Sequence, residues 1–340
     1  MTDPLRLRID TLALADNWRM LARMSGAAAC GAAIKADGYG LGAATVVRQL
    51  GAAGCRDFFV ATWAEAARLA DLRPPLSVLH GVRAEDMTCA LSGLARPVLS
   101  SDVQVARWKA AGGGACDVMV DTGMNRLGVS PDAVRAGLLD GLTIETLMSH
   151  LACADEDSAM NARQQAAFVA LAGVTRARRM SLANSAGIAL GADYAFDLTR
   201  PGLALYGGIP RAAFAGAIRQ VVTPEAQILQ RRTVRAGETV GYNAAWTAPR
   251  DTAVAILNLG YADGYFRGFS DTGSAAGGTL PVIGRVSMDL LALDVGAAAD
   301  LAEGDWVALD FALPEAAARS GMSQYELLTS LGRRYERVGA

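Results

Sequence analysis

Short apolar runs alternate with segments of helical spacing from about residue 10 to residue 230. The runs are apolar on both faces, which is typical of buried strands in a parallel sheet. Eight of them are expected to form strands: Cys30–Lys35, Asp57–Thr62, Leu76–His80, Pro97–Ser100, Cys116–Val120, Glu145–Ser149, Arg179–Ala183 and Leu203–Tyr206. Eight such units predict a (β/α)8 barrel, although a doubly wound open sheet would give the same alternation.

Helices are expected between these strands. Asp10 and Thr11 precede the apolar segment Leu12–Met24 and predict an N-capped helix before the first strand. Helical spacing also covers Leu41–Ala53, Ala64–Leu72, Ser101–Ala111 and Ser158–Ala172. Polar residues recur where the expected strands end, at Lys35, Asp121, His150 and Asn184. The carboxyl ends of barrel strands converge on the face that carries the active site, so these side chains are expected to share a pocket.

The pattern changes after about residue 230, where helical periodicity fades and short alternating runs lie between glycine-containing turns. Expected strands are Thr252–Leu259, Leu280–Arg285, Leu290–Val295 and Trp306–Leu309, and Glu315–Leu331 is expected to form a helix. We therefore predict an α/β fold in which residues 1–230 form a TIM-type barrel. Residues 231–340 are predicted to form a mostly antiparallel β-domain.

Composition limits the classes of function. The chain has 340 residues, of which 52% are hydrophobic and 19% charged, as in globular proteins. Its net charge of −2 predicts no nucleic-acid partner, and no apolar run is long enough to predict a membrane span. The first residues do not resemble a signal peptide, and five scattered cysteines predict reduced thiols in the cytoplasm. Two isolated histidines predict no metal site.

The segment Ala33–Gly40 carries the most informative chemistry. Lys35 leaves an apolar strand there, and the loss of hydration favours the neutral amine that attacks a carbonyl. Gly38 and Gly40 permit a sharp turn, and Tyr39 supplies a hydroxyl. These features suit a Schiff-base lysine for pyridoxal phosphate. An ordinary lysine extending from a strand end beside a glycine-containing turn would show the same residues.

Ile34–Gly40 resembles the cofactor-lysine segment of alanine racemases, pyridoxal-phosphate enzymes that combine a barrel with a β-domain. Further segments match that family in order along the chain: Val120–Gly128, Ser149–Ala152, Ala183–Gly187, Asp197–Gly207, Thr239–Asn243, Gly260–Gly264 and Gly284–Asp289. The resemblance implies interconversion of L-alanine and D-alanine by a homodimer whose subunits share their active sites.

The resemblance also implies a role for each matched residue. Lys35 would bind the cofactor and exchange the α-proton of the D-enantiomer, and Tyr242 would exchange that of the L-enantiomer. Cofactor contacts are implied for Lys35, Tyr39, His150, Asn184, Ser185, Arg200, Gly202 and Leu203, and substrate contacts for Arg126, Tyr261, Met288 and Asp289. Arg200 would face the pyridine nitrogen and leave it unprotonated, because arginine does not readily give up its proton. This favours racemisation over transamination.

Two positions near Arg126 depart from the family pattern. Many members have a lysine, often carbamylated, at the position of Met119, and its negative charge orients the arginine. Asn125 stands where glycine is common. The partner of Arg126 is left open between Asn125, a bound chloride and water. Tyr335 would contact the cofactor phosphate only if the local alignment shifts.

Related activities share most of these motifs. Racemases of serine, lysine or several amino acids are open alternatives. Basic amino-acid decarboxylases pair the pyridine nitrogen with an acid, whereas this chain has Arg200. A non-catalytic pyridoxal-phosphate-binding protein usually lacks the β-domain. The sequence does not distinguish supply of D-alanine for peptidoglycan from its catabolism.

Overall fold

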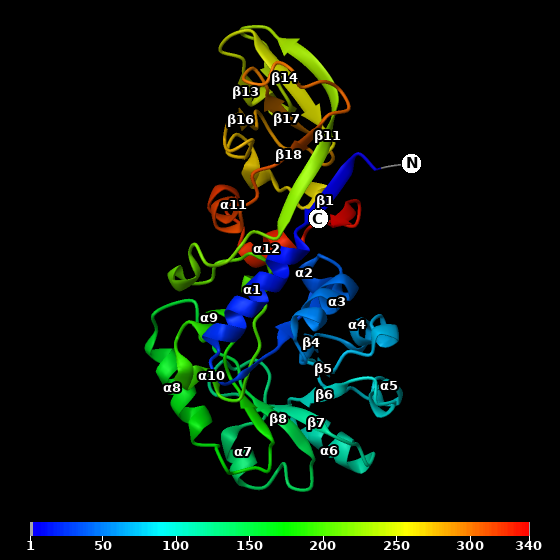
Figure 1. The fold of residues 1–340 in the computed structure, drawn as a ribbon, viewed down its shortest axis with the longest axis vertical. Coiled ribbons are helices and arrows are strands. Elements are labelled where there is room, and N and C mark those ends of the chain that lie inside the picture. The colour runs from blue at the N-terminus through cyan, green and yellow to red at the C-terminus, as the bar shows by residue number, and fades with distance from the viewer. Residues whose placement is uncertain (1–2, 340) are drawn as a thin grey trace. The chain divides into compact units, whose positions relative to one another are not determined.

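A computed structural model describes residues 3–339 and divides the chain into two compact units (Figure 1). The barrel unit comprises Leu14–Leu205 and Ile209–Arg219. The β unit comprises the residues through Ala13, Tyr206–Gly208 and the residues from Gln220 onward. The candidate residues from Lys35 to Leu203 lie in the barrel unit, and Tyr242, Tyr261, Met288 and Asp289 lie in the β unit.

Seven parallel strands follow one another in chain order in the barrel unit (Figure 1). They are β3 (Ala32–Ala33), β4 (Phe58–Val60), β5 (Leu76–Val78), β6 (Arg96–Leu99), β7 (Cys116–Met119), β8 (Ile144–Met148) and β9 (Arg179–Ser181). An eighth strand, β10 (Leu198–Thr199), pairs with β2 (Ala29–Cys30), which directly precedes β3. The Arg200 N–H donates to the Ala183 carbonyl at 2.8 Å beyond β9, so β10 closes the barrel. The predicted barrel is confirmed.

The predicted eighth strand is wrong. Leu203–Tyr206 is a 3-10 helix, and the barrel uses Leu198–Thr199 instead. Leu203–Tyr206 is an apolar and buried run, as a strand of the barrel would be. However, the Ser185 hydroxyl accepts hydrogen bonds from the N–H groups of Gly202 at 2.9 Å and Ala204 at 3.2 Å. These bonds hold the backbone in a turn.

Side-chain caps begin several barrel helices. Asp10 Oδ1 accepts from Ala13 N at 2.7 Å at the start of α1, as predicted, and Ser101 and Ser158 cap α6 and α8. The helices are α1 (Thr11–Met24), α2 (Lys35–Tyr39), α3 (Ala43–Ala53), α4 (Trp63–Ala67), α5 (Met87–Leu91), α6 (Asp102–Ala110), α7 (Pro131–Arg135), α8 (Ala159–Val169), α9 (Ser185–Ile188) and α10 (Ala192–Ala195). In Figure 1, α3 to α8 lie outside the ring of strands.

The β unit contains a mostly antiparallel sheet built around one long strand, β11 (Val222–Val234). Its other strands are β1 (Leu5–Ile9), β14 (Thr252–Leu257), β17 (Leu291–Asp294), β18 (Trp306–Ala308) and β19 (Glu336–Gly339). Short pairs add β12 (Thr239–Val240) with β13 (Trp246–Thr247) and β15 (Ser274–Ala275) with β16 (Leu280–Pro281). The first described strand, β1, is therefore part of the β unit, antiparallel to β11 and parallel to β19.

The single helix expected over Glu315–Leu331 is two helices, α11 (Leu313–Ser320) and α12 (Gln324–Thr329). Gly321 ends the first at a φ of 72°, a left-handed conformation that favours glycine. Ser323 then starts the second with a capping box to Glu326.

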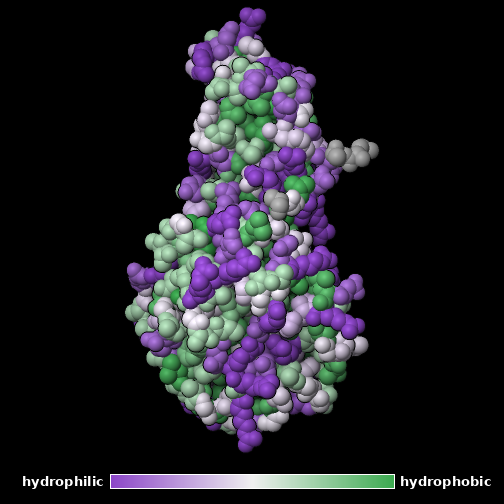
Figure 2. Space-filling view, in the orientation of Figure 1, coloured by the Kyte–Doolittle hydropathy of each residue, from purple (hydrophilic) through white to green (hydrophobic). Residues whose placement is uncertain are grey.

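The surface shown in Figure 2 mixes hydrophilic and hydrophobic residues, in line with the small net charge of −2. Within residues 3–339, no helix combines the length and apolar character needed to cross a membrane.

Candidate active site

Lys35 begins a left-handed turn at the carboxyl end of β3. Residues 36–39 all have positive φ, from 53° to 64°. Gly38 N donates to Ile34 O at 2.8 Å, and Gly40 N donates to Ala36 O at 2.9 Å. Left-handed backbone costs about 1–2 kcal/mol for each residue that is not glycine. The turn therefore needs strong contacts to hold it.

Glu65 supplies such contacts. Its Oε1 accepts a hydrogen bond from Ala36 N at 2.7 Å. Its Oε2 accepts from Ala61 N at 2.7 Å and from Thr62 N at 3.3 Å. Glu65 lies in the first turn of α4, which Thr62 caps in return. One carboxylate thus ties the backbone after Lys35 to the start of α4.

Charged side chains at this end of the barrel shift the pKa values of Lys35 and His150. The pKa of Lys35 is lowered by burial and by the charges of Arg126 and Arg200, although Glu65 opposes the shift. Lys35 is accessible to solvent, and the protein around its ammonium group makes the neutral amine easier to form than in a free lysine. Burial and the charges of Arg200, Arg126 and Lys35 lower the pKa of His150 to about 3, so its imidazole is neutral near pH 7.

Arg200 is buried inside the barrel. Its guanidinium donates to the Ser149 carbonyl at 2.6 Å and to the Ser181 hydroxyl. Burial lowers the pKa of Arg200 to about 10, and the charge of Asp117 opposes this shift. The guanidinium therefore stays charged near pH 7. It can donate hydrogen bonds to a ring nitrogen but gives up its proton poorly.

Hydroxyl and backbone N–H groups gather beside the Lys35 turn. A Cβ on Gly202 would lie 2.3 Å from the Tyr39 hydroxyl, so the close approach requires glycine. Gly202 N in turn donates to the buried Ser185 hydroxyl. Asn184 Oδ1 caps α9 by accepting from Gly187 N at 2.8 Å, and Leu203 begins the following 3-10 helix. We call Tyr39, Ser185 and Gly202 the cradle.

Arg126 lies in the exposed loop after β7. Asp121 Oδ1 accepts from Gly123 N at 2.8 Å and from Asn125 N at 3.1 Å. Asn125 has a φ of 56°, which asparagine adopts more readily than most residues. Within residues 3–339, the Arg126 guanidinium has no hydrogen bond or ion pair. Asn125 is therefore not its partner in this structure.

Met119 belongs to an apolar layer inside the barrel. It packs with residues from β4, β6, β8 and β10, which meet only in the barrel interior: Phe59, Val98, Met148 and Leu198. Leu79 packs against the same cluster. Met119 therefore places a buried thioether, and no charge, below the Arg126 loop.

Two segments of the β unit bring Tyr261 close to Met288 and Asp289. Tyr261 N and Ala262 N donate to the carbonyls of Ser287 and Met288, each at 3.0 Å. Asp289 forms an ion pair with Arg334 at 2.7 Å. Tyr242 and Met288 are exposed, by 64% and 53%, so both can contact another molecule. The Tyr335 hydroxyl is buried and has no hydrogen-bond partner among the described residues.

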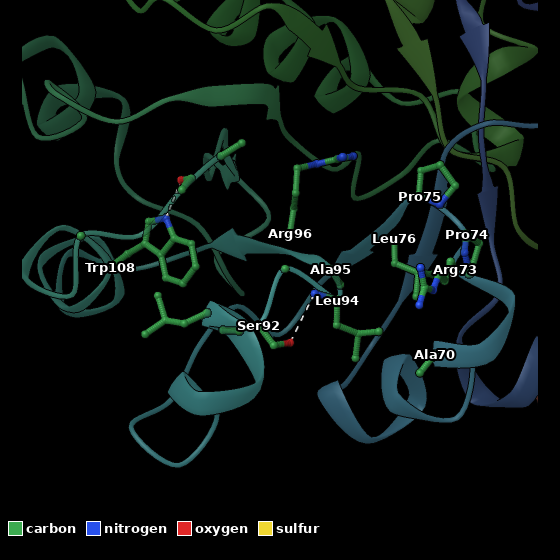
Figure 3. Close-up of a pocket in the computed structure, with 16 residues that line it drawn as sticks. Ala70, Arg73, Pro74, Pro75, Leu76, Ser92, Leu94, Ala95, Arg96 and Trp108 are labelled. Atoms are coloured by element: carbon green, nitrogen blue, oxygen red, sulfur yellow. Dashed lines mark hydrogen bonds between the residues drawn. The ribbon is translucent and has the colours of Figure 1, made fainter.

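A groove of about 900 Å³ lies at the other end of the barrel unit (Figure 3). It borders the amino-terminal ends of β5 and β6 and is lined by Pro74, Pro75, Leu94, Arg96 and Trp108, among others. None of the predicted site residues lines it. This groove is therefore separate from the Lys35 cluster.

Sequence reasoning did not identify Glu65 or the acceptors of Arg200, Ser149 and Ser181. Thr62-x-x-Glu65 is a readable capping-box signature, but that signature predicts only a helix start. Nothing in the sequence indicates that the same carboxylate also binds Ala36, 29 residues away.

A parallel barrel that places a lysine after its first strand, with a buried arginine and a cradle of hydroxyl groups at the same end, and that is followed by a β unit, is typical of a class of pyridoxal-phosphate enzymes acting on amino acids. The match to known proteins is more specific. Residues 9–210 match the family model described as the alanine racemase N-terminal domain, and residues 221–339 match the alanine racemase C-terminal domain.

Individual relatives agree over the whole length. The chain is 43% identical to an alanine racemase of Acidiphilium cryptum, over 98% of both proteins. It is 42% identical to a catabolic alanine racemase of Agrobacterium fabrum, over 97% of this chain and 91% of the relative. The crystal structure of Bartonella henselae alanine racemase with covalently bound pyridoxal phosphate matches with a TM-score of 0.91 and 32% identity, over 100% of both chains. The chain belongs to the alanine racemase family.

Proposed function

We propose that this protein interconverts L-alanine and D-alanine with pyridoxal phosphate, and that Lys35 and Tyr242 move the α-proton. The family membership carries the reaction and the cofactor. One observation in the structure carries the assignment of residues. Lys35, Arg126 and Arg200 form no ion pair with an acid among residues 3–339, and burial together with their charges lowers the pKa of His150 to about 3. This uncompensated positive charge suits the phosphate of the cofactor and the carboxylate of the substrate.

The residues of the barrel unit fit the cofactor. When bound, pyridoxal phosphate stabilises negative charge at the α-carbon of the amino acid. The cradle of Tyr39, Ser185 and Gly202 would hold the phosphate through two hydroxyls and a backbone N–H. Arg200 would donate to the ring nitrogen and keep it unprotonated, because the guanidinium remains a cation with a pKa of about 10.

Two side chains would exchange the α-proton. Lys35, whose pKa is lowered by burial, takes and returns the proton on the face used by the D-enantiomer. The Tyr242 hydroxyl does so on the opposite face, used by the L-enantiomer. Arg126 holds the substrate carboxylate through a charge-assisted hydrogen bond. Met288, Asp289 and Tyr261 complete the substrate contacts.

The direct test is chiral chromatography of L-alanine after incubation with the purified protein and pyridoxal phosphate. We expect D-alanine to form with wild-type protein and to be absent with Lys35→Ala. L-Serine and L-lysine in parallel reactions define the substrate range. Conversion of serine or lysine without conversion of alanine would assign the protein to a different racemase activity. No conversion of any of the three would contradict the proposal.

We also propose a homodimer in which the partner's Tyr242 completes each site. Tyr242, Met288 and Leu290 of the β unit are exposed by 64%, 53% and 40%, and such apolar side chains are typical of an interface. Lys35→Ala and Tyr242→Phe subunits can be unfolded together and refolded. If sites are shared, each mixed dimer regains one intact site, so about one quarter of wild-type activity returns. Activity no greater than that of the two parents would rule out shared sites.

We place the reaction in the cytoplasm, where its product would supply peptidoglycan. The free cysteines support this placement, because Cys30, Cys55, Cys89, Cys116 and Cys153 form no disulfide. Free, mostly buried thiols are typical of a reducing compartment.

A further inference from the structure

Gln164 on α8 is a fully buried polar side chain to which the proposed chemistry assigns no role. Its Oε1 accepts a hydrogen bond from Ala152 N at 2.8 Å. Its Nε2 donates to the His150 carbonyl at 2.9 Å and to Thr122 Oγ1 at 3.3 Å. The amide therefore bonds the loop after β7 and the loop after β8 at the same time.

The bonds of Gln164 fix the orientation of its amide. A flipped amide would place its NH₂ group against Ala152 N–H and its oxygen against the His150 carbonyl, so two attractions would become repulsions. Both amide hydrogens and the oxygen are thus used in a single arrangement. No other uncharged side chain of similar size offers one acceptor and two donors in this geometry.

The network continues from Gln164 to two arginines. Thr122 Oγ1 shares a hydrogen bond of 2.7 Å with the Ser149 hydroxyl, and the Ser149 carbonyl accepts from Arg200. Thr122 also lies four residues before Arg126, in the loop whose turn Asp121 holds. Gln164 is thus connected to the buried Arg200 through Thr122 and Ser149. It also holds the loop that carries the exposed Arg126.

Packing adds a second contact between α8 and this loop. A Cβ on Gly123, whose φ is 129°, would lie 2.7 Å from the Met160 methyl group. The loop backbone therefore approaches α8 closely at Gly123, and the Thr122 side chain next to it accepts a hydrogen bond from Gln164 of α8. The Arg126 guanidinium itself has no protein partner within residues 3–339. Its position consequently depends on the backbone that carries it.

We propose that Gln164 is a positioning residue that sets Arg126 for the substrate carboxylate by holding Thr122 against the β8 loop. This inference rests on the proposed role of Arg126. Met119 is buried and has no charge with which to orient Arg126. The proposal gives this orienting role to the neutral, buried amide of Gln164. The network orients the loop, and Arg126 stays free to bind an anion.

The test uses the holoenzyme with substitutions at Gln164, Thr122, Gln165 and Arg126. Gln164→Leu removes all the amide bonds. Thr122→Val removes only the bonds of the Thr122 hydroxyl at nearly constant volume, so it is informative even if Gln164→Leu fails to fold. Gln165→Leu is the matched control, because Gln165 is the next residue on α8 and makes only an exposed bond to Asp193 O. The readouts are hydrogen exchange of peptides covering 119–129, inhibition by propionate (a carboxylate without an amino group), and the kinetic constants KM and kcat.

We expect faster exchange in 119–129 for Thr122→Val and Gln164→Leu, together with about tenfold weaker propionate binding and a rise in KM that exceeds the fall in kcat. Gln165→Leu should match wild type in all three readouts. Unchanged exchange and unchanged propionate binding in the folded variants would overturn the proposal. Arg126→Gln distinguishes an error in the role of Gln164 from an error in the role of Arg126. If Arg126→Gln also leaves propionate binding unchanged, the carboxylate role of Arg126 is wrong, and the positioning role assigned to Gln164 is wrong with it.

Discussion

Within the described residues, charged side chains are paired at the amino end of the barrel interior and lack acidic partners at the carboxyl end. At the amino end, Arg179 grips both carboxylate oxygens of Asp57, at 2.7 and 3.1 Å. Arg96 pairs with the buried Asp117 at 3.4 Å, and Ser77 donates to the same carboxylate at 2.6 Å. At the carboxyl end, Lys35, Arg126 and Arg200 have no acidic ion-pair partner among residues 3–339.

An apolar layer separates these ends. Residues of five strands meet there, and the cluster contains no titratable group: Phe59, Val98, Met119, Met148 and Leu198. A buried charge is tolerated when a partner neutralises it, as at the amino end. Positive charges without partners repel one another and raise the free energy of the empty site. An anion that binds there neutralises them and lowers the free energy of the site. The comparison indicates that the amino end stabilises the barrel, and it supports the proposal that the carboxyl end binds ligands.

The largest expected effect on stability contrasts the two ends directly. Asp57→Asn leaves Arg179 without its main partner and should lower the free energy of unfolding by about 2–3 kcal/mol. This value is below the usual cost of a broken buried pair, because 22% of the Arg179 side chain is exposed. Arg126→Gln should change the free energy of unfolding by no more than about 0.5 kcal/mol, since no partner is lost. Urea unfolding of both variants checks the contrast, and equal losses would contradict it.

The next effect depends on pH. The pKa of His150 is lowered from 6.5 to about 3. Between these two pH values the imidazole is protonated in the unfolded chain and neutral in the folded chain. Stability should therefore fall as pH drops below 6.5, by up to about 1.4 kcal/mol for each pH unit from this residue. His150→Gln should remove that part of the slope in urea unfolding between pH 7 and 5. His80→Gln, at an exposed position, is the control. A slope unchanged by His150→Gln would show that His150 accepts a proton in the folded state.

Sequence patterns predicted the barrel because seven of its strands are short apolar runs with turns on either side. They failed at Leu203–Tyr206, where burial imitates a strand although side-chain bonds from Ser185 hold a turn. They also did not predict β1, which belongs to the β unit although residues 1–230 are predicted to form the barrel. Its pairing with β11 joins residues more than 200 positions apart, as between Leu5 and Ala226. Local periodicity contains no information on such distant pairing.

The same limit applies to the candidate site. Lys35 and Arg200 lie in segments that resemble a family, so the amino-acid sequence alone is enough to propose roles for them. Gln164 and Glu65 act on backbone atoms of distant segments, and any residue type supplies an N–H or a carbonyl. Their partners leave no signature in the sequence, and only the folded chain identifies them. Burial in the folded chain also lowers the pKa of Arg200 to about 10, below the value above 12 assumed from the residue type.

The smallest expected effect concerns Glu65, a carboxylate at the ligand-binding end that bonds backbone N–H groups instead of a cation. Glu65→Gln replaces one of its oxygens with an NH₂ group, so either Ala36 N or the pair Ala61 N and Thr62 N loses its acceptor. The free energy of unfolding should fall by about 1 kcal/mol. Loss of the negative charge should also lower the pKa of Lys35 further, because Glu65 now raises it. The pH dependence of Lys35 labelling by an amine-reactive reagent, measured by mass spectrometry on protein without cofactor, reports that pKa. A labelling profile that does not move toward lower pH would show that Glu65 shapes the backbone of the site but not its charge.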